Sequence, residues 1–330
     1  MELFGAIIIL LIGLILIIKG GDWFVDSASW IAHAAKIPTF IVGATIVSFA
    51  TTLPELIVSV LATIQDKNDM AVGNAIGTIN ANAGIILAIS LSFMSIVTPR
   101  KNYWQQCLLL VVSSLTLWLG CLSTSLNIWI SLVLLIMYFI FISINLFQGR
   151  LETKNQKDVI LDTTLILEDK KTKRIIINRR TVIKKIIFFI LGAIGIVLGS
   201  NLLINGGSTI AESLGVPERL IAITLVAIGT SLPELVTTIT AIRKKEASLS
   251  IGNIIGANIF NITLILPICS LIAQDAFNIS QQTLVIDFPF CLLFSLIATI
   301  PLLWKQRTYR WQGILMLITY VAYLTISIIL

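Results

Sequence analysis

Two glutamates stand in apolar stretches of the sequence in nearly the same local surroundings. Glu55 ends the run Thr51-Thr52-Leu53-Pro54-Glu55, and Glu234 ends the run Thr230-Ser231-Leu232-Pro233-Glu234. An ionised carboxylate at the centre of a bilayer costs about 2.5 kcal/mol or more, so intramembrane acids usually face a cavity or a partner. We therefore expect both carboxylates to line a functional site.

The residues just before each glutamate supply further oxygen atoms. Proline lacks a backbone donor and clashes with the carbonyl four residues earlier, which leaves carbonyl oxygens free near the acid. Both runs are accordingly poor candidates for unbroken helix. Hydroxyl groups lie on the same turns, and they belong to Thr51, Thr52, Thr230 and Ser231.

An amide follows each glutamate at the same spacing: these are Asn82 and Asn261. Asn82 comes after the run Gly73-Asn74-Ala75-Ile76-Gly77, and Asn261 after Gly252-Asn253-Ile254-Ile255-Gly256. Small residues at this spacing let helices approach closely. We expect Asn82 and Asn261 to face the opposite glutamate motif, whereas for Asn74 and Asn253 direct ligation of a cation and a polar contact between helices are both left open.

This set of side chains consists of oxygen ligands only, which hard cations prefer. Calcium takes about six to eight oxygens at about 2.3–2.6 Å in flexible geometry, and two glutamates neutralise one calcium ion. An anion would be repelled, because no Lys or Arg is near in the sequence. The single histidine, His33, and four isolated cysteines do not have the spacing of a zinc site or a disulfide framework.

The elements that must position these residues are transmembrane helices. Hydrophobic residues make up 57% of the 330-residue chain and charged residues 12%, whereas soluble domains have about 25% charged residues. Apolar runs near the length of about 20 residues that crosses a bilayer recur along the chain. They cover roughly 3–19, 39–64, 71–97, 104–123, 126–147, 185–205, 217–242, 248–273, 283–304 and 311–330. We predict an all-α polytopic membrane protein with ten transmembrane helices.

Basic residues are concentrated in one connection. Eleven Lys or Arg lie between Gly149 and Lys185, whereas the connection from Gln274 to Gln282 has none. The positive-inside rule places the basic linker 149–184 in the cytoplasm, with both termini outside. We interpret the linker as an orientation signal rather than a nucleic-acid or specific lipid site. Its apolar triplets at 159–161 and 175–177 are typical of a short β-hairpin.

The chain repeats itself at one constant offset in residue number. Matched residues include Pro38 with Pro217, Glu55 with Glu234, and Asn82 with Asn261. Each half holds five segments, an odd number, so the second half enters the membrane from the opposite side. We therefore predict two inverted five-helix repeats, 1–148 with a motif region at 43–90, and 185–330 with one at 222–270. Secondary transporters place their sites where the discontinuous helices of such repeats meet.

These motifs resemble those of the calcium/cation antiporter superfamily, specifically its prokaryotic sodium/calcium exchanger branch. That family carries a Gly-Thr-Ser-x-Pro-Glu motif and a Gly-Asn-x-x-Gly-Ser-Asn motif in each repeat, and the resemblance spans essentially the whole chain. It implies that Glu55 and Glu234 are the central calcium carboxylates. It also assigns the flanking hydroxyl and carbonyl ligands to Thr51, Thr52, Thr230 and Ser231, and the later polar ligands to Asn82 and Asn261.

Several positions depart from the family pattern. Ala50 stands where the first motif has glycine, and Ala257 replaces a serine, which leaves the number of sodium sites open. The proton-coupled branch has a second acid where Gly77 and Gly256 stand here, so the resemblance favours sodium coupling. Potassium-dependent exchangers are among the relatives with aspartate at the position of Asn261, so potassium cotransport is disfavoured.

The sequence thus predicts a sodium-driven calcium antiporter of the cytoplasmic membrane that works by alternating access, rather than an enzyme. Its expected partners are Ca²⁺, Na⁺ and the lipid bilayer, without a cofactor and without nucleic acid. Proton/calcium exchange, or exchange of another divalent cation, is the alternative among transporters. A cation channel or a membrane scaffold is the alternative outside them. A channel more naturally uses a symmetric oligomeric pore, whereas inverted repeats within one chain favour rocking around one site.

Overall fold

The computed structural model describes residues 2–93, 103–163, 179–213, 231–273 and 277–329, and these are nearly all helical. The first part of the chain forms α1 (Glu2–Ala35), α2 (Thr39–Val42), the π-helix η1 (Gly43–Val47), α3 (Ser48–Ile64), α4 (Asn68–Ala81), the π-helix η2 (Asn82–Leu87), α5 (Ala88–Phe93), α6 (Trp104–Gly120), the short strand β1 (Ser125–Leu126) and α7 (Ile128–Thr163). The second part forms α8 (Arg179–Ser213), α11 (Leu232–Arg243), α12 (Ala247–Phe260), the π-helix η5 (Asn261–Ile265), α13 (Leu266–Ile272), the strand β2 (Phe277–Asn278), the π-helix η6 (Thr283–Asp287), α14 (Phe288–Lys305) and α15 (Arg310–Ile329).

The helices have the length and surface of membrane spans. Seven described helical stretches are long and apolar enough to cross a membrane, and Trp104–Gly120 is a shorter apolar helix. Large apolar side chains such as Ile15, Ile136 and Ile318 point outward and are exposed in the isolated chain, as a lipid-facing surface requires. The expected segment at 217–242 lies partly outside the described residues.

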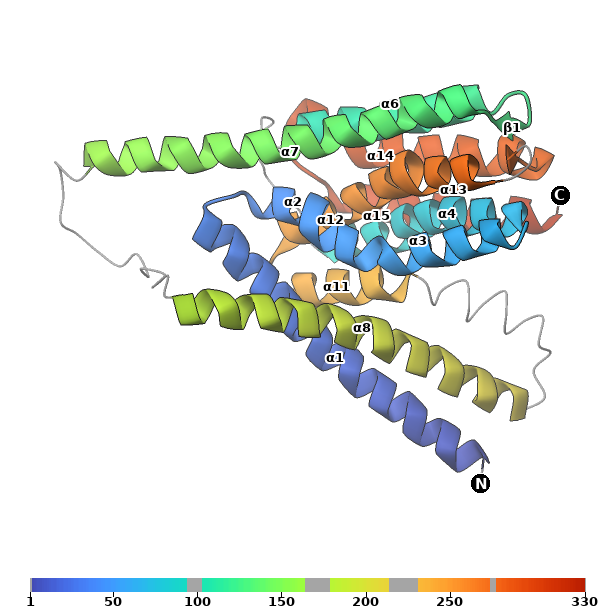
Figure 1. Cartoon of the computed structure of the whole chain (residues 1–330), viewed down its shortest axis with the longest axis horizontal. Coiled ribbons are helices and arrows are strands. Elements are labelled where there is room, and N and C mark those ends of the chain that lie inside the picture. The colour runs from blue at the N-terminus through green and yellow to red at the C-terminus, as the bar shows by residue number, and fades with distance from the viewer. Residues whose placement is uncertain (1, 94–102, 164–178, 214–230, 274–276, 330) are drawn as a thin grey trace.

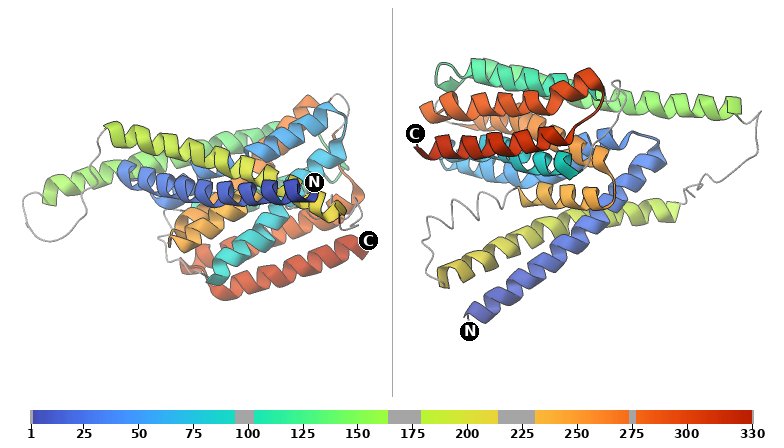
Figure 2. Two further views of the ribbon diagram at one scale, coloured as in Figure 1. Left: turned by 90° about the horizontal axis from the view of Figure 1, so that it is seen from below. Right: turned by 180° about the vertical axis from the view of Figure 1, so that it is seen from behind.

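Helices α1 and α8 form a pair that lies to one side of the other helices (Figure 1 and the right view of Figure 2). Their backbones touch, because a Cβ atom on Gly13 would lie 2.8 Å from the carbonyl oxygen of Gly199. Gly20 meets Gly192 in the same way, so contacts farther along α1 fall earlier along α8. The two helices are therefore antiparallel, and Phe24 stacks on Phe189 at a centroid distance of 4.5 Å within the pair.

Local backbone features recur at the offset seen in the sequence. The π-helices η2 and η5 begin at Asn82 and Asn261, which are equivalent positions of the two halves. Asp66 and Lys245, which match at the same offset, both have positive φ, 57° and 61°. Non-glycine residues adopt this conformation rarely. The two halves therefore share unusual backbone turns as well as sequence motifs.

The ends of the helices place both termini at one end of the molecule. In Figure 1, α1 begins and α15 ends at the end opposite to that where α7 stops and α8 starts. Strands β1 and β2 pair antiparallel, with Ser125 opposite Asn278 and Leu126 opposite Phe277. The sequence prediction of a strand at 159–161 was wrong, because α7 continues as a helix through Thr163. Residues 175–177 lie outside the described residues.

Candidate cation-binding site

Glu55 lies on a helix that runs through its proline. Helix α3 extends from Ser48 to Ile64 with Pro54 inside it, so the sequence expectation of a break at this motif was wrong. The irregular backbone lies earlier, in the π-helical turn Gly43–Val47 that leads into α3. Pro54 still removes one backbone donor from the turn before Glu55. The Thr51 hydroxyl donates to the carbonyl oxygen of Ser48 at 3.2 Å, and Thr52 donates to the same carbonyl.

Glu234 occupies a different position in its helix, the first turn of α11. Ser231 is the N-cap residue, and Pro233 lies in the first turn. Backbone N–H groups in the first turn have no partner within the helix, so proline costs no hydrogen bond there. The free N–H groups and the helix dipole at this end favour a negative charge. Among the other residues of this motif, Thr230 lies outside the described residues.

Both carboxylates are buried in the interior of the protein. Glu55 and Glu234 are both 0% exposed, and their side-chain oxygens have no hydrogen-bond partner among the described residues. Helix α11, which carries Glu234, packs against α3, which carries Glu55, and the two acids are close enough for their charges to interact. Burying two unpaired negative charges is costly unless a cation compensates them. This pair is therefore a candidate centre for a divalent cation.

Asn82 and Asn261 begin η2 and η5, which pack against α11 and α3, the helices that carry the two glutamates. The Asn82 side-chain nitrogen donates to the Asn258 side-chain oxygen at 3.2 Å, and that of Asn261 donates to the Ala257 carbonyl at 2.9 Å. Both side chains are fully buried, and their oxygens have no donor among the described residues. Each amide nitrogen is thus bonded to a neighbouring group of the protein, whereas each amide oxygen remains free to coordinate a cation.

The earlier asparagines hold the motif helices in place. Asn253 accepts a hydrogen bond from Thr51 at 3.3 Å, a contact between the two halves. Asn74 donates to the Ser59 hydroxyl at 2.9 Å and to the Glu55 backbone carbonyl at 3.3 Å. Both are thus contacts between helices, one of the two roles that the sequence left open for them.

Two glycines of α12 bring the halves close enough for these contacts. A Cβ atom on Gly252 would collide with the carbonyl oxygen of Phe40 in α2, and one on Gly256 with that of Ala44 in η1. Backbone therefore packs directly against backbone, which only glycine permits. Asn253 lies between these two glycines and is bonded to Thr51. Thr51 follows the end of η1, at Val47, by four residues.

Sequence reasoning missed some polar groups of this region. Asn258 pairs with Asn82 and also donates to the Ile79 carbonyl at 3.5 Å. Its equivalent in the first half is Ile79, so the repeat gives no signal for it. The buried hydroxyls of Thr237 and Thr238 on α11 also have no partner among the described residues. No motif of the sequence marks these two threonines, which stand three and four residues after Glu234.

Three further acids lie near helix ends: Asp22, Asp26 and Asp287. Lys244 forms an ion pair with Asp26 at 2.7 Å and a second with Asp22 at 3.4 Å, which joins α1 to the turn after α11. Asp287 accepts a hydrogen bond from the Tyr323 hydroxyl at 3.1 Å, and its backbone carbonyl accepts one from Asn80. These acids already have partners.

Comparison with known proteins places these observations in a family. The family model for sodium/calcium exchanger proteins matches residues 5–147 and 184–329. A membrane protein of Methanocaldococcus jannaschii is 31% identical over 316 residues, covering 94% of each chain. Sodium/calcium exchanger MaX1 of Methanosarcina acetivorans is 29% identical over 344 residues, covering 97% of each.

Solved structures agree with the sequence comparisons. A structure of the sodium-calcium exchanger NCX_Mj, soaked with Na⁺ and Sr²⁺, superposes with a TM-score of 0.81 at 26% identity. It covers 98% of this chain, and this chain covers 99% of it. Sequence and fold agree over nearly the full length. The chain therefore belongs to the sodium/calcium exchanger family.

Proposed function

We propose that this protein exchanges sodium for calcium across the cytoplasmic membrane, and that both ions bind at the centre formed by Glu55 and Glu234. The observation that carries the proposal is that these acids are fully buried and lack hydrogen-bond donors among the described residues. The relative from Methanosarcina acetivorans is named as a sodium/calcium exchanger, and so is the solved structure that matches the fold.

The ligand set accounts for exchange between the two ions. One calcium ion balances both carboxylates, and the oxygens of Thr51, Asn82 and Asn261 complete a shell of the kind that calcium accepts. Sodium is also a hard cation that binds to oxygen, so it competes for the same acids. Binding of one ion therefore requires release of the other. Thr52, Thr230 and Ser231 are the further proposed ligands.

We place the site between two inverted repeats of five transmembrane helices each. The antiparallel pair of α1 and α8 supports this arrangement, because Gly13 and Gly20 of α1 match Gly192 and Gly199 of α8 at the repeat offset. In such transporters one repeat rocks against the other around a site near the midplane. Alternating access then exposes the glutamate pair to each side of the membrane in turn.

Calcium movement in reconstituted vesicles tests the coupling ion. We expect calcium efflux from proteoliposomes to follow an imposed sodium gradient, because Gly77 and Gly256 leave no additional carboxylate in the second motifs for a proton. The measurement is ⁴⁵Ca²⁺ release with external sodium or with choline, at fixed pH and clamped membrane potential.

Choline serves as the control for ionic strength. Calcium flux that is unchanged in choline but follows a pH gradient would assign the protein to proton/calcium exchange instead. Calcium flux that needs no sodium gradient, no pH gradient and no counter-ion would indicate a channel.

Cysteine labelling tests the orientation with linker 149–184 in the cytoplasm. Lys170→Cys is expected to resist a membrane-impermeant maleimide in intact cells and to react after permeabilisation. The four native cysteines are buried, so they give little background. Ser123→Cys is the matched control, because Ser123 is exposed at the opposite end and is expected to react from outside. Reversed labelling of the two variants contradicts this topology.

A further inference from the structure

One lysine joins the two halves of the chain through a set of polar contacts. Lys244, in the turn after α11, forms ion pairs with two acids of α1, with Asp26 at 2.7 Å and with Asp22 at 3.4 Å. Its ammonium group also donates to the backbone carbonyl oxygen of Asp22 at 2.9 Å. Three acceptors on α1 thus match the three N–H donors of one ammonium group. We call these three residues the charged clamp.

The two helices are in close contact beside the charged clamp. A Cβ atom on Gly21 of α1 would lie 2.8 Å from the hydroxyl oxygen of Thr240 and 3.0 Å from a methyl group of Val236, both on α11. Thr240 is only 4% exposed. In Figure 1, α1 runs past α11 toward the end of the molecule where α7 stops and α8 starts, which we call the linker end. The clamp and this close packing therefore close the interface between α1 and α11 at the linker end.

The matching positions of the other half hold neutral residues. At the repeat offset, Asn201 and Asn205 of α8 match the two acids of the clamp, and Gln65, just after α3, matches Lys244. All three side chains are exposed, and none of them carries a charge with which to form an ion pair. In Figure 1, α3 ends at the opposite end of the molecule, where α1 begins and α15 ends, which we call the terminal end. The charged clamp thus exists at one end only.

The packing of the helices differs between the two ends in the same sense. Leu61 of α3, the match of Thr240, is 50% exposed, whereas Thr240 is buried. Ile57, one turn earlier on α3, is 56% exposed. Ser200 of α8 stands where α1 has Gly21, so the side chain that glycine leaves out at the linker end is present here. The interface between α3 and α8 is therefore less closely packed than that between α1 and α11.

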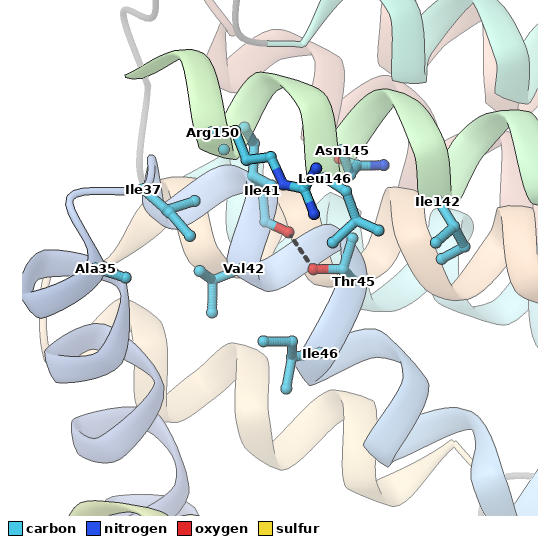
Figure 3. A pocket seen from close by; sticks show the side chains of 11 residues that line it. Ala35, Ile37, Ile41, Val42, Thr45, Ile46, Ile142, Asn145, Leu146 and Arg150 are labelled. Carbon is cyan, nitrogen blue, oxygen red and sulfur yellow. Dashed lines mark hydrogen bonds between the residues drawn. The ribbon is translucent and has the colours of Figure 1, made fainter. Parts of the chain in front are cut away.

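Beyond the charged clamp, the end of α1 borders a hollow. This space of about 550 Å³ lies between α7 and the segment formed by α2 and η1 (Figure 3). Ala35, the last residue of α1, and Ile37 line it, whereas no residue of the clamp does. A close-packed interior resists movement, but this hollow leaves room for the end of α1 to shift. The clamp therefore holds a helix whose end has space to move.

A transporter built from inverted repeats has two states, each of which closes the site toward one side of the membrane. A contact that forms in only one of the two states shifts their ratio by its own free energy. We propose that the charged clamp keeps the linker end closed and thereby favours the state in which the terminal end opens, where the matching residues are neutral. This inference rests on the alternating access proposed above. With the linker in the cytoplasm, the favoured state is closed on the cytoplasmic side.

The charged clamp acts on the conformation and not on the cation centre. Its side chains contact one another and the backbone of α1, and none of these contacts involves a proposed ligand. The same two glutamates bind the ion in either state, and in detergent both ends of the protein face the same solution. Loss of the clamp is therefore expected to change which end is open and to leave the calcium affinity of the purified protein unchanged.

Cysteine accessibility in the full chain, reconstituted in nanodiscs without calcium or sodium, tests the proposal. Thr240→Cys reports on the linker end, because this side chain is buried against Gly21. In that background, Lys244→Gln is expected to raise the rate of reaction with a water-soluble maleimide about fivefold, which corresponds to about 1 kcal/mol, the upper range for a partly exposed ion pair.

Lys245→Gln is the matched control, because Lys245 is the next lysine in the chain, is exposed and forms no ion pair with any described residue. It is expected to leave the labelling rate unchanged. Loss of the fold would also raise the labelling of the four native cysteines, which are buried, so their rates distinguish unfolding from opening of the linker end. A folded Lys244→Gln variant that labels at Thr240→Cys as slowly as the parent overturns the proposal.

Transfer of the clamp to the other half tests why the terminal end opens. The variant combines Asn201→Asp, Asn205→Asp and Gln65→Lys, with Leu61→Cys as the reporter at that end. The new charges are expected to slow maleimide labelling at Leu61→Cys about fivefold. Labelling that is not slowed overturns the assignment of the open terminal end to the missing charges. Both rates are measured without ion movement, so these results are independent of whether the protein exchanges sodium for calcium.

Discussion

Glu55→Gln and Glu234→Gln are each expected to lower calcium affinity at least about a hundredfold while the protein remains folded. Removing one partner of a buried charge pair typically costs about 3–5 kcal/mol, and each 1.4 kcal/mol corresponds to a factor of ten in affinity. Glutamine preserves the size of the side chain, and the two acids have no described hydrogen bonds that the change would break. Binding of ⁴⁵Ca²⁺ to purified protein measures the effect.

Asp26→Asn is the matched control, because it removes an acid that pairs with Lys244 outside the centre. It is expected to leave calcium affinity unchanged. Asn82→Ala and Asn261→Ala are expected to reduce affinity less than the glutamate changes, since each removes one neutral ligand from several. A folded Glu234→Gln protein with nearly wild-type affinity would exclude a centre shared by the two glutamates.

Gly252→Val and Gly256→Val are expected to destabilise the protein and to weaken calcium binding. The added side chain meets the carbonyl oxygens of Phe40 and Ala44, which are backbone atoms that cannot turn aside. Overpacking in a close-packed interior costs about 1–3 kcal/mol or more. The helices must then separate, and the bond between Thr51 and Asn253 is lost. Thermal unfolding in detergent and calcium titration measure the two effects.

Gly149→Ala serves as the control for replacing a helical glycine. Its new Cβ atom makes only an ordinary contact with Ile37, and alanine has a higher helix propensity than glycine. We expect no loss of stability in this variant. If Gly252→Val binds calcium and melts like the wild-type protein, the close approach of α12 to α2 is not required for the site.

The acids and amides of the proposed centre could be selected from the sequence because the repeat marks them. Glu55 and Glu234 match at a fixed offset, and so do Asn82 and Asn261. Hydropathy likewise predicted a nearly all-helical membrane protein. These features depend on residue type and spacing, which the sequence records directly.

Other features depend on tertiary contacts between the halves. Asn258 joins the polar network, although its repeat equivalent is Ile79, because α12 packs closely against the first half. The continuation of α3 through Pro54 was not predicted, because helix packing outweighs the local cost of one lost backbone bond. The π-helical turns have no signature in the pattern of apolar residues.

The π-helices η2 and η5 also bear on the history of the chain. A π-helical turn holds about one residue more than an α-helical turn, and both begin at equivalent asparagines, Asn82 and Asn261. Asp66 and Asn82 keep the repeat offset up to the first residue of η2, so the π-helical turn begins at the same place in both halves. A turn shared at equivalent positions is the arrangement expected if the extra residue preceded the duplication of the halves.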